Sequence, residues 1–122
     1  MSRLQFERTH ATTVVATAVI AANRFVGYGG AHASATAGGA ADAQGVSEMA
    51  AAIGDVIPVV TGYSYLVEAS APITKHALVK PAADGSGRAV AGSMADHCGR
   101  ALAAATAAGQ LIEVEILEHV HP

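Results

Sequence analysis

The sequence has no tryptophan, a single cysteine and few aromatic side chains, which make up 4% of its 122 residues. The lone Cys98 excludes an internal disulfide bond and a cysteine-rich metal site, and it fits synthesis in a reducing cytoplasm. Positive charge is also scarce, because only seven lysines and arginines occur and the formal net charge is -3. Without a basic cluster, the chain lacks the electrostatic footprint of a protein that binds nucleic acid or an anionic membrane.

Long apolar runs are missing as well. The longest weakly polar stretch, residues 11–22, is interrupted by three threonines and is too short to cross a bilayer as a helix. The first ten residues carry charges of both signs and no apolar core, unlike a secretory signal peptide. We therefore expect a soluble protein with neither a nucleic-acid nor a membrane partner, synthesised in the cytoplasm.

The abundant residues are alanine, about a quarter of the chain, and glycine, with 13 copies. A chain of this length forms one domain, and alanine methyl groups bury little apolar area, so the core is expected to be thin. We expect an N-terminal arm over residues 1–12 and a single β-rich domain over residues 13–122. A thin core makes help from neighbouring subunits or from a docking surface plausible.

Short runs of β-branched and aromatic residues alternate with glycine and proline, a pattern typical of a small β-barrel or sandwich. The fold expected is all-β, with room for one short helix. The strands are predicted at Thr13–Ile20, Arg24–Tyr28, Val56–Glu68, Ala77–Lys80, Arg88–Ala91 and Leu111–Glu118. Asp84-Gly85 and Ser86-Gly87 tolerate positive φ, which predicts a hairpin between Leu78–Pro81 and Arg88–Ala91.

The run Val56–Glu68 alternates for part of its length, with Tyr63, Tyr65 and Val67 on one side. Gly62 is expected to bend or bulge this strand, so that one long strand serves two parts of a curved sheet. Pro58 has no N–H to give to a ladder and is expected at a strand edge or a bulge.

The stretch from Gly99 to Leu117 begins with an alanine run and ends in an alternating strand. We predict that residues 99–105 form the antiparallel partner of residues 111–117, because pairing with a strong strand outweighs the helix propensity of alanine. A helix over Met94–Ala108 is the alternative, although Gly99 in its middle weakens it. Residues 31–44, rich in alanine and without an apolar period, are predicted to form an exposed loop.

A weak internal repeat relates the two parts of the chain. Ile20, Phe25-Val26, Asp42, Gly45 and Gly54 recur 53 to 55 residues later as Ile73, Leu78-Val79, Asp96, Gly99 and Gly109. Gly54 precedes the strand-like run VIPVV, and Gly109 precedes the strand-like run LIEVEI. The repeat predicts a fold built from two similar halves.

Catalytic and metal-binding patterns are weak. His119 and His121 would share one face of a strand, but no third ligand lies nearby in the sequence, and the other four histidines are isolated. Glu113 and Glu115 are better explained as a solvated strand face than as a catalytic pair. No nucleophile elbow or phosphate-binding loop occurs. We expect no enzyme activity, no metal and no cofactor.

The order of motifs resembles the capsid cement, or head decoration, proteins of tailed bacteriophages. The motifs are, in order, RFVGYGG, DAQGVSEMAAAIGDVIPVVTGYSYLVEAS, APIT, LVKPAADGSGRAV and CGRALAAATAAGQLIEVEIL. The resemblance covers residues 12–117. Lys75-His76-Ala77 departs from the Ala-Gly-Asp that the family often has after the Ile-Thr step. The resemblance implies a small β-rich protein that binds the outer surface of the assembled icosahedral head, through the major capsid protein, and stabilises it. It supplies no active site.

A homotrimer or a dimer would fit the symmetry axes of such a shell. Arg3, Phe6 and Arg8 form a short arm that is either a disordered terminus or a contact with the shell or a neighbouring subunit. The alternative function is a small ligand- or glycan-binding β module displayed on the virion, and its only candidate aromatic cluster is Tyr63 with Tyr65.

Overall fold

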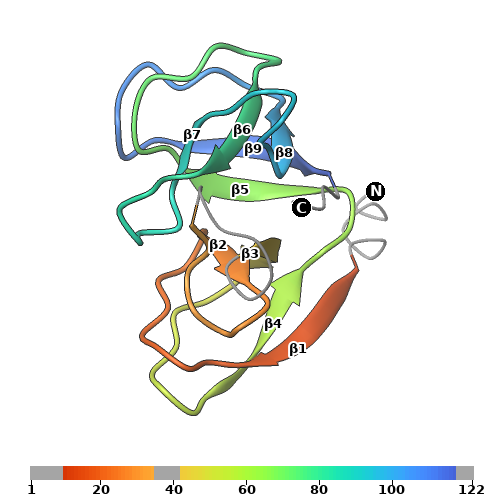
Figure 1. The fold of residues 1–122 in the computed structure, drawn as a ribbon, viewed down its shortest axis with the longest axis vertical. Coiled ribbons are helices and arrows are strands. Elements are labelled where there is room, and N and C mark those ends of the chain that lie inside the picture. Colours follow the sequence, from red (N-terminus) through yellow and green to blue (C-terminus); the bar gives the residue numbers. More distant parts are fainter. Residues whose placement is uncertain (1–9, 35–41, 118–122) are drawn as a thin grey trace, which may run out of the picture.

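The computed structural model describes residues 10–34 and 42–117, and these form two antiparallel sheets without a helix (Figure 1). One sheet has the strand order β1-β4-β3-β2 and the other β5-β9-β8-β6-β7. The strands are β1 (Ala11–Val15), β2 (Phe25–Gly27), β3 (Ala43–Ser47), β4 (Val56–Val60), β5 (Ser64–Glu68), β6 (Leu78–Pro81), β7 (Ala89–Ala91), β8 (Gly99–Ala101) and β9 (Leu111–Ile116). The all-β prediction is confirmed, and of its two architectures the molecule adopts the sandwich, because neither sheet closes into a barrel.

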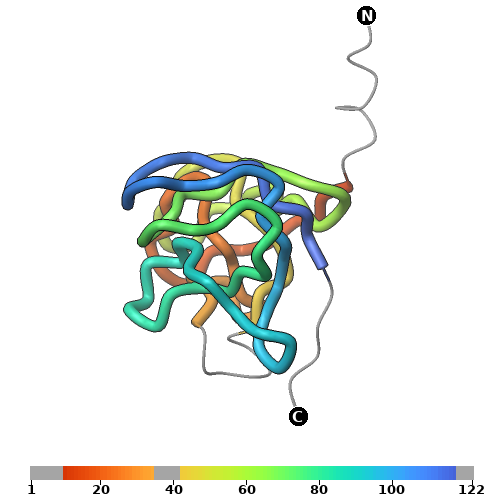
Figure 2. The backbone as a smooth tube through the Cα atoms, turned by 90° about the horizontal axis from the view of Figure 1, so that it is seen from above, coloured from red at the N-terminus to blue at the C-terminus, as the bar shows by residue number. Residues whose placement is uncertain are grey.

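Each sheet is built from one half of the chain, and the two sheets lie one above the other in Figure 1. The prediction of one long strand over residues 56–68 is wrong, because the chain leaves the first sheet at Val60 and enters the second at Ser64. His10 packs against this crossing: its carbonyl accepts the Thr61 N–H at 2.7 Å, and a Cβ on Gly62 would lie 2.9 Å from the His10 Cβ. Figure 2 shows the start of β1 beside this link.

The two halves share one topology. Strands β1, β4, β3 and β2 are neighbours in the same order as β5, β9, β8 and β6, and β7 is an addition at the edge of the second sheet. Registers agree as well, because Val26 pairs with Gly45 in the first half and Val79 pairs with Gly99 in the second. The predicted two similar halves are therefore present in three dimensions.

The duplication extends to the core. One cluster of buried residues holds seven side chains of the first half, and the counterpart of every one lies in the larger cluster, with the same residue type. The pairs are Val14 and Val67, Ala16 and Ala69, Ile20 and Ile73, Val26 and Val79, Ala51 and Ala105, Ile57 and Ile112, and Val59 and Val114. Small aliphatic side chains thus form two matched thin cores rather than one thick one.

The larger cluster also joins the halves. Phe25, Ala33 and Val46 belong to the first half but pack with the core of the second, and each is at most 1% exposed. Phe25 and Val46 are cross-strand partners on β2 and β3, so they present one sheet face to the second half. Burying a side chain such as Phe25 stabilises the junction by about 1.5–3 kcal/mol.

Two local predictions were wrong in instructive ways. Residues 31–44 are not a wholly exposed loop: Ala33 and Asp42 are buried, and Ala43 begins strand β3, which the sequence analysis missed. Pro58 lies in β4, a central strand, not at an edge or a bulge. It is tolerated because the β3 ladder reaches only Val59, and because its partner Thr13 occupies a non-hydrogen-bonded position.

The remaining strand predictions hold with changed boundaries: β1 begins two residues before the predicted Thr13, β6 ends one residue after the predicted Lys80, and the others are shorter. The β6–β7 hairpin pairs Val79 with Ala91, and its turn has Gly85 at φ 81° and Gly87 at φ 71°. β8 pairs antiparallel with β9, as predicted, and no helix forms over residues 94–108. The chain leaves β8 after Ala101 and bridges Ala105 to Ile73, so the pairing is shorter than the 99–105 expected.

Candidate interaction surfaces

The predicted contact residues Arg3, Phe6 and Arg8 lie outside the described residues, as do His119 and His121. Candidate surfaces among the described residues lie on the two sheets and their connections. Two features are candidates: a polar network between the halves, and exposed aliphatic side chains on β1, on β4 and in the turn before β4.

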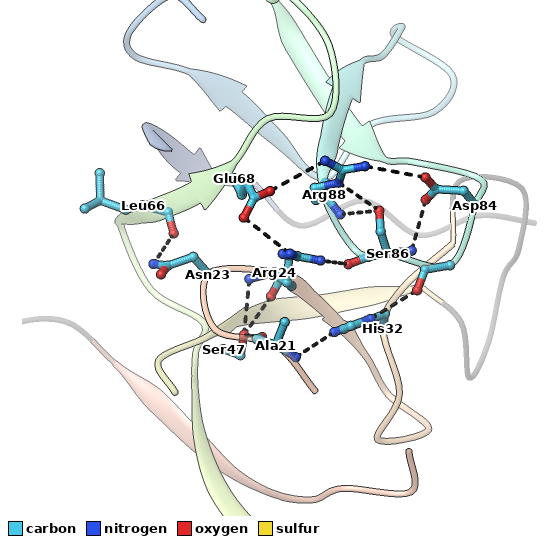
Figure 3. A network of polar contacts seen from close by, with 11 residues as sticks. Ala21, Asn23, Arg24, His32, Ser47, Leu66, Glu68, Asp84, Ser86 and Arg88 are labelled. Carbon is cyan, nitrogen blue, oxygen red and sulfur yellow. Dashed lines mark hydrogen bonds and ion pairs between the residues drawn. The ribbon is translucent and has the colours of Figure 1, made fainter. Parts of the chain in front are cut away.

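The polar network is centred on Glu68, at the end of β5 (Figure 3). Its carboxylate lies 3.3 Å from Arg24 Nη2 of the first half and 3.5 Å from Arg88 Nη1 of the second. Arg24 also donates Nη1 to the Ser86 carbonyl at 2.8 Å, and Arg88 lies 3.9 Å from Asp84. The side chains of Arg24, Glu68 and Arg88 are only partly exposed, so solvent screens their charges less than those of a surface pair. The network fixes the first half against the β6–β7 turn.

Asn23 connects the first half to the free edge of β5. Its carbonyl accepts the Glu68 N–H at 3.0 Å, and its Nδ2 donates to the Leu66 carbonyl at 2.9 Å. Asn23 adopts a left-handed backbone conformation, with φ 62°, which asparagine tolerates better than most residues. The turn before β2 thus acts as a short cap on an edge strand that would otherwise be open.

His32 bridges the same junction. Its Nε2 accepts the Ala21 N–H at 3.1 Å, so Nδ1, which is 3.1 Å from the Gly85 carbonyl, carries the proton and donates. Burial lowers the pKa of His32, and the nearby Arg24 guanidinium adds to that effect, while the Gly85 hydrogen bond opposes it. The ring is therefore held neutral with one defined tautomer.

Exposed apolar side chains lie on edge strand β1 and on its neighbour β4 in the first half. Val15 and Val56 are cross-strand partners on β1 and β4 and are 55% and 62% exposed. Ile53, in the turn that leads into β4, is 68% exposed. We call these three residues the β1–β4 patch. Val15 and Val56 thus place two exposed aliphatic side chains next to each other, which makes this surface a candidate for protein contact.

The second half carries charge at the matching place. Val15 corresponds to Glu68 and Val56 to Leu111, which is 51% exposed. The first half therefore covers the edge of the second half at Glu68, whereas the corresponding edge position of the first half, Val15, stays exposed. Aligning the two halves of the sequence could have revealed this valine-for-glutamate difference, but its meaning depends on the junction, which no local pattern indicates.

The two tyrosines expected to form an aromatic cluster separate. Tyr65 lies in β5 and packs against the larger core cluster, and burial, helped by Glu48, raises its pKa. Tyr63 is 68% exposed and has φ 63°, which removes it from the alternation of the strand. The prediction that Tyr63 continues the alternation of Tyr65 and Val67 on one side of a strand is therefore wrong.

Two other side chains that could react, Cys98 and Glu113, are buried or hydrogen-bonded within the fold. Cys98 is buried in the larger cluster, and desolvation raises the pKa of its thiol far above the usual range. Glu113 accepts a hydrogen bond from Ser64 on the neighbouring strand. Across residues 10–34 and 42–117, no three histidine, cysteine or acidic side chains group closely enough to hold a metal ion. The same residues contain no helix long and apolar enough to cross a membrane.

No protein-family model matches the chain, and no curated protein matches its sequence. Its fold is similar to that of the head fiber gp8.5 N base in bacteriophage phi29, known from a crystal structure. The TM-score is 0.63 at 20% sequence identity, and the alignment covers 91% of this chain and 99% of that chain. At this identity, the likeness establishes a shared fold over almost the full length of both chains.

Proposed function

We propose that this chain is a structural protein of a tailed-phage head, and more specifically a decoration protein. It binds the outside of the assembled shell through the major capsid protein and stabilises the shell. The observation that carries the proposal is the fold shared with a phage head fiber base over nearly its whole length. The order of sequence motifs points to the same class of particle independently.

The surface of the molecule supports a binding role rather than a catalytic one. The β1–β4 patch exposes aliphatic side chains, which suit a protein partner, whereas the titratable groups of the junction are engaged in holding the halves together. A protein that binds only the assembled shell stabilises it by mass action, and many copies multiply the effect. A homotrimer or a dimer of the chain would match the local symmetry of such a shell.

The test uses phage particles from the host that encodes the chain, with the gene intact or deleted. Protein composition of purified heads is measured by mass spectrometry, and head rupture is followed by release of DNA on heating or osmotic shock. We expect the protein in the wild-type heads and rupture of the deletion heads at lower temperature. Absence of the protein from the heads contradicts the proposal, and equal robustness of both heads contradicts the stabilising role.

A further inference from the structure

One part of the contact between the two halves joins two surfaces, and each of these two surfaces has a counterpart elsewhere on the same chain. The first surface is the turn at Asn23 and Arg24. The second is the outward edge of β5, at Leu66 and Glu68. Because the halves share topology and register, both counterparts can be located by residue.

The counterpart of the Asn23 turn is the turn 74–77. His76 has φ 74° where Asn23 has φ 62°, and no other described residue apart from Tyr63 and glycine has positive φ. The His76 N–H donates to the Ala101 carbonyl at 2.7 Å, as the Asn23 N–H donates to the Ser47 carbonyl at 3.0 Å. Both turns therefore share the left-handed residue and its hydrogen bond, and Ala77, a partly buried residue packed against the larger core cluster, takes the place of Arg24. His76 is exposed.

The counterpart of the β5 edge is the outward edge of β1. Hydrogen bonds from Ala16 to Asp55 and from Thr61 to His10 show that the even-numbered residues of this strand bond to β4. The N–H of Val15 and the carbonyl of Thr13 consequently point away from the sheet. No described residue takes the place that Asn23 occupies on β5, and both Thr13 and Val15 are exposed.

The side chains at the two counterpart surfaces match each other in character. In the internal junction, Arg24 faces Glu68 at 3.3 Å, a pair of opposite charges. At the counterpart surfaces, the corresponding residues are Ala77 and Val15, both apolar. If only one of the two positions had changed, a charge would face an aliphatic side chain at a cost of desolvation. The two positions differ together, as expected for surfaces that meet.

We propose that the turn 74–77 of one copy docks on the outward edge of β1 of a second copy, repeating between chains the contact that Asn23 makes with β5 within the chain. His76 takes the role of Asn23 toward Thr13 and Val15, and Ala77 packs on the β1–β4 patch. The contact joins two different surfaces, so it is heterologous, and copies linked by it form a ring when the rotation closes. This inference refines the oligomer of the proposed function and does not require attachment to a head.

The first experiment transfers the internal charge pair to the proposed contact. Association of the purified full-length protein, without phage heads, is measured by sedimentation velocity over a range of concentrations. Val15→Glu is expected to weaken association by at least about tenfold, equivalent to 1.4 kcal/mol, because a carboxylate then faces Ala77. The double variant Val15→Glu, Ala77→Arg is expected to restore it. Met94→Glu, at another exposed apolar residue, is the matched control and is expected to leave association unchanged.

The second experiment reads the proximity of two residues in neighbouring copies instead of a change in affinity. Differently tagged copies carrying Thr13→Cys or His76→Cys are co-expressed, purified together and oxidised. We expect a disulfide between the two kinds of copy, and none when His76→Cys is combined with Ala108→Cys, an exposed turn position. Cys98 is buried and stays out of the reaction.

The proposal is overturned if Val15→Glu associates as well as the unchanged protein, if the mixed Thr13–His76 disulfide does not form, or if the unchanged protein remains monomeric. Failure of the head-binding test would leave these results untouched, because they are obtained without heads. Conversely, a protein that binds heads but shows none of these effects retains the proposed function and loses this contact.

Discussion

Gly54 and Gly109 occupy the same place in the two halves of the molecule. Their φ angles are 92° and 91°, and each donates its N–H at 2.8 Å to an alanine carbonyl, that of Ala16 or Ala69. Side chains close both turns in the same way: Asp55 accepts the Ala52 N–H at 2.9 Å, and Gln110 accepts the Thr106 N–H at 2.7 Å. The two turns therefore end in the same way, although the second is one residue longer and most of their residues differ.

Replacement of either glycine by alanine is therefore expected to cost the same. A Cβ at either position meets no atom within 4 Å, so the penalty is that of a left-handed backbone alone, about 1–2 kcal/mol. Urea denaturation of Gly54→Ala and Gly109→Ala measures it, and asparagine at either position is expected to cost less. Clearly unequal losses for the two alanine variants would argue against equivalent turns.

Gly45 and Gly99 form a second corresponding pair with a different physical requirement. A Cβ on Gly45 would lie 2.1 Å from the Val60 carbonyl oxygen, and one on Gly99 would lie 2.7 Å from that of Glu115. Because the obstacle is backbone, we expect alanine at either position to destabilise by about 1–3 kcal/mol or more, with the larger loss at Gly45. Thermal unfolding of the two variants checks this order, and a Gly45→Ala protein as stable as the unchanged one would refute the close approach.

Glu68 is expected to be the most sensitive charge in the molecule. Glu68→Gln leaves Arg24 and Arg88 facing each other across a partly buried site, and we expect a loss of about 1–3 kcal/mol, between the values for exposed and fully buried pairs. Chemical denaturation measures the loss, with Glu48→Gln on an exposed residue as the control. Equal stability of both variants would show that the network does not hold the halves together.

Stability is expected to fall on mild acidification because of His32. Its pKa in the folded protein lies below the ordinary value of 6.5, so between those two values the unfolded chain binds more protons than the native one. The stability contributed by the neutral ring is complete above pH 6.5 and is lost as the pH falls toward the native pKa.

Melting temperatures at several pH values between 7.5 and 5 measure this loss. In His32→Gln, whose amide keeps a donor and an acceptor without titrating, the pH dependence is expected to be shallower. His10→Gln, at an exposed residue, serves as the control. An unchanged slope in His32→Gln would rule out this contribution.

The duplicated features were the most predictable from sequence, because they depend on local geometry. Glycines at turns, the Ile20 and Ile73 positions and the alternating run after Gly109 all reflect backbone requirements that act within a few residues. The hairpin over residues 78–91 was predicted for the same reason. Strand β3 was not, because AQGVS has a single β-branched residue and is stabilised by its neighbours β2 and β4.

The junction and the candidate surfaces were beyond sequence analysis for a different reason. Arg24 and Glu68 are 44 residues apart, and nothing in either neighbourhood indicates the other. Residues 56–68 cross from one sheet to the other where Gly62 closely approaches His10, which is also a long-range contact. The exposure of Val15 and Val56 follows from the arrangement of whole sheets.

The central claim is attachment to the outer surface of a phage head, and difference cryo-EM tests it most directly. Heads with and without the chain are reconstructed at a resolution that shows strands. The account predicts extra density on the outside of the shell, in which the four-stranded and five-stranded sheets fit as two similar lobes. Identical reconstructions, or density for the chain only inside the shell, would contradict it.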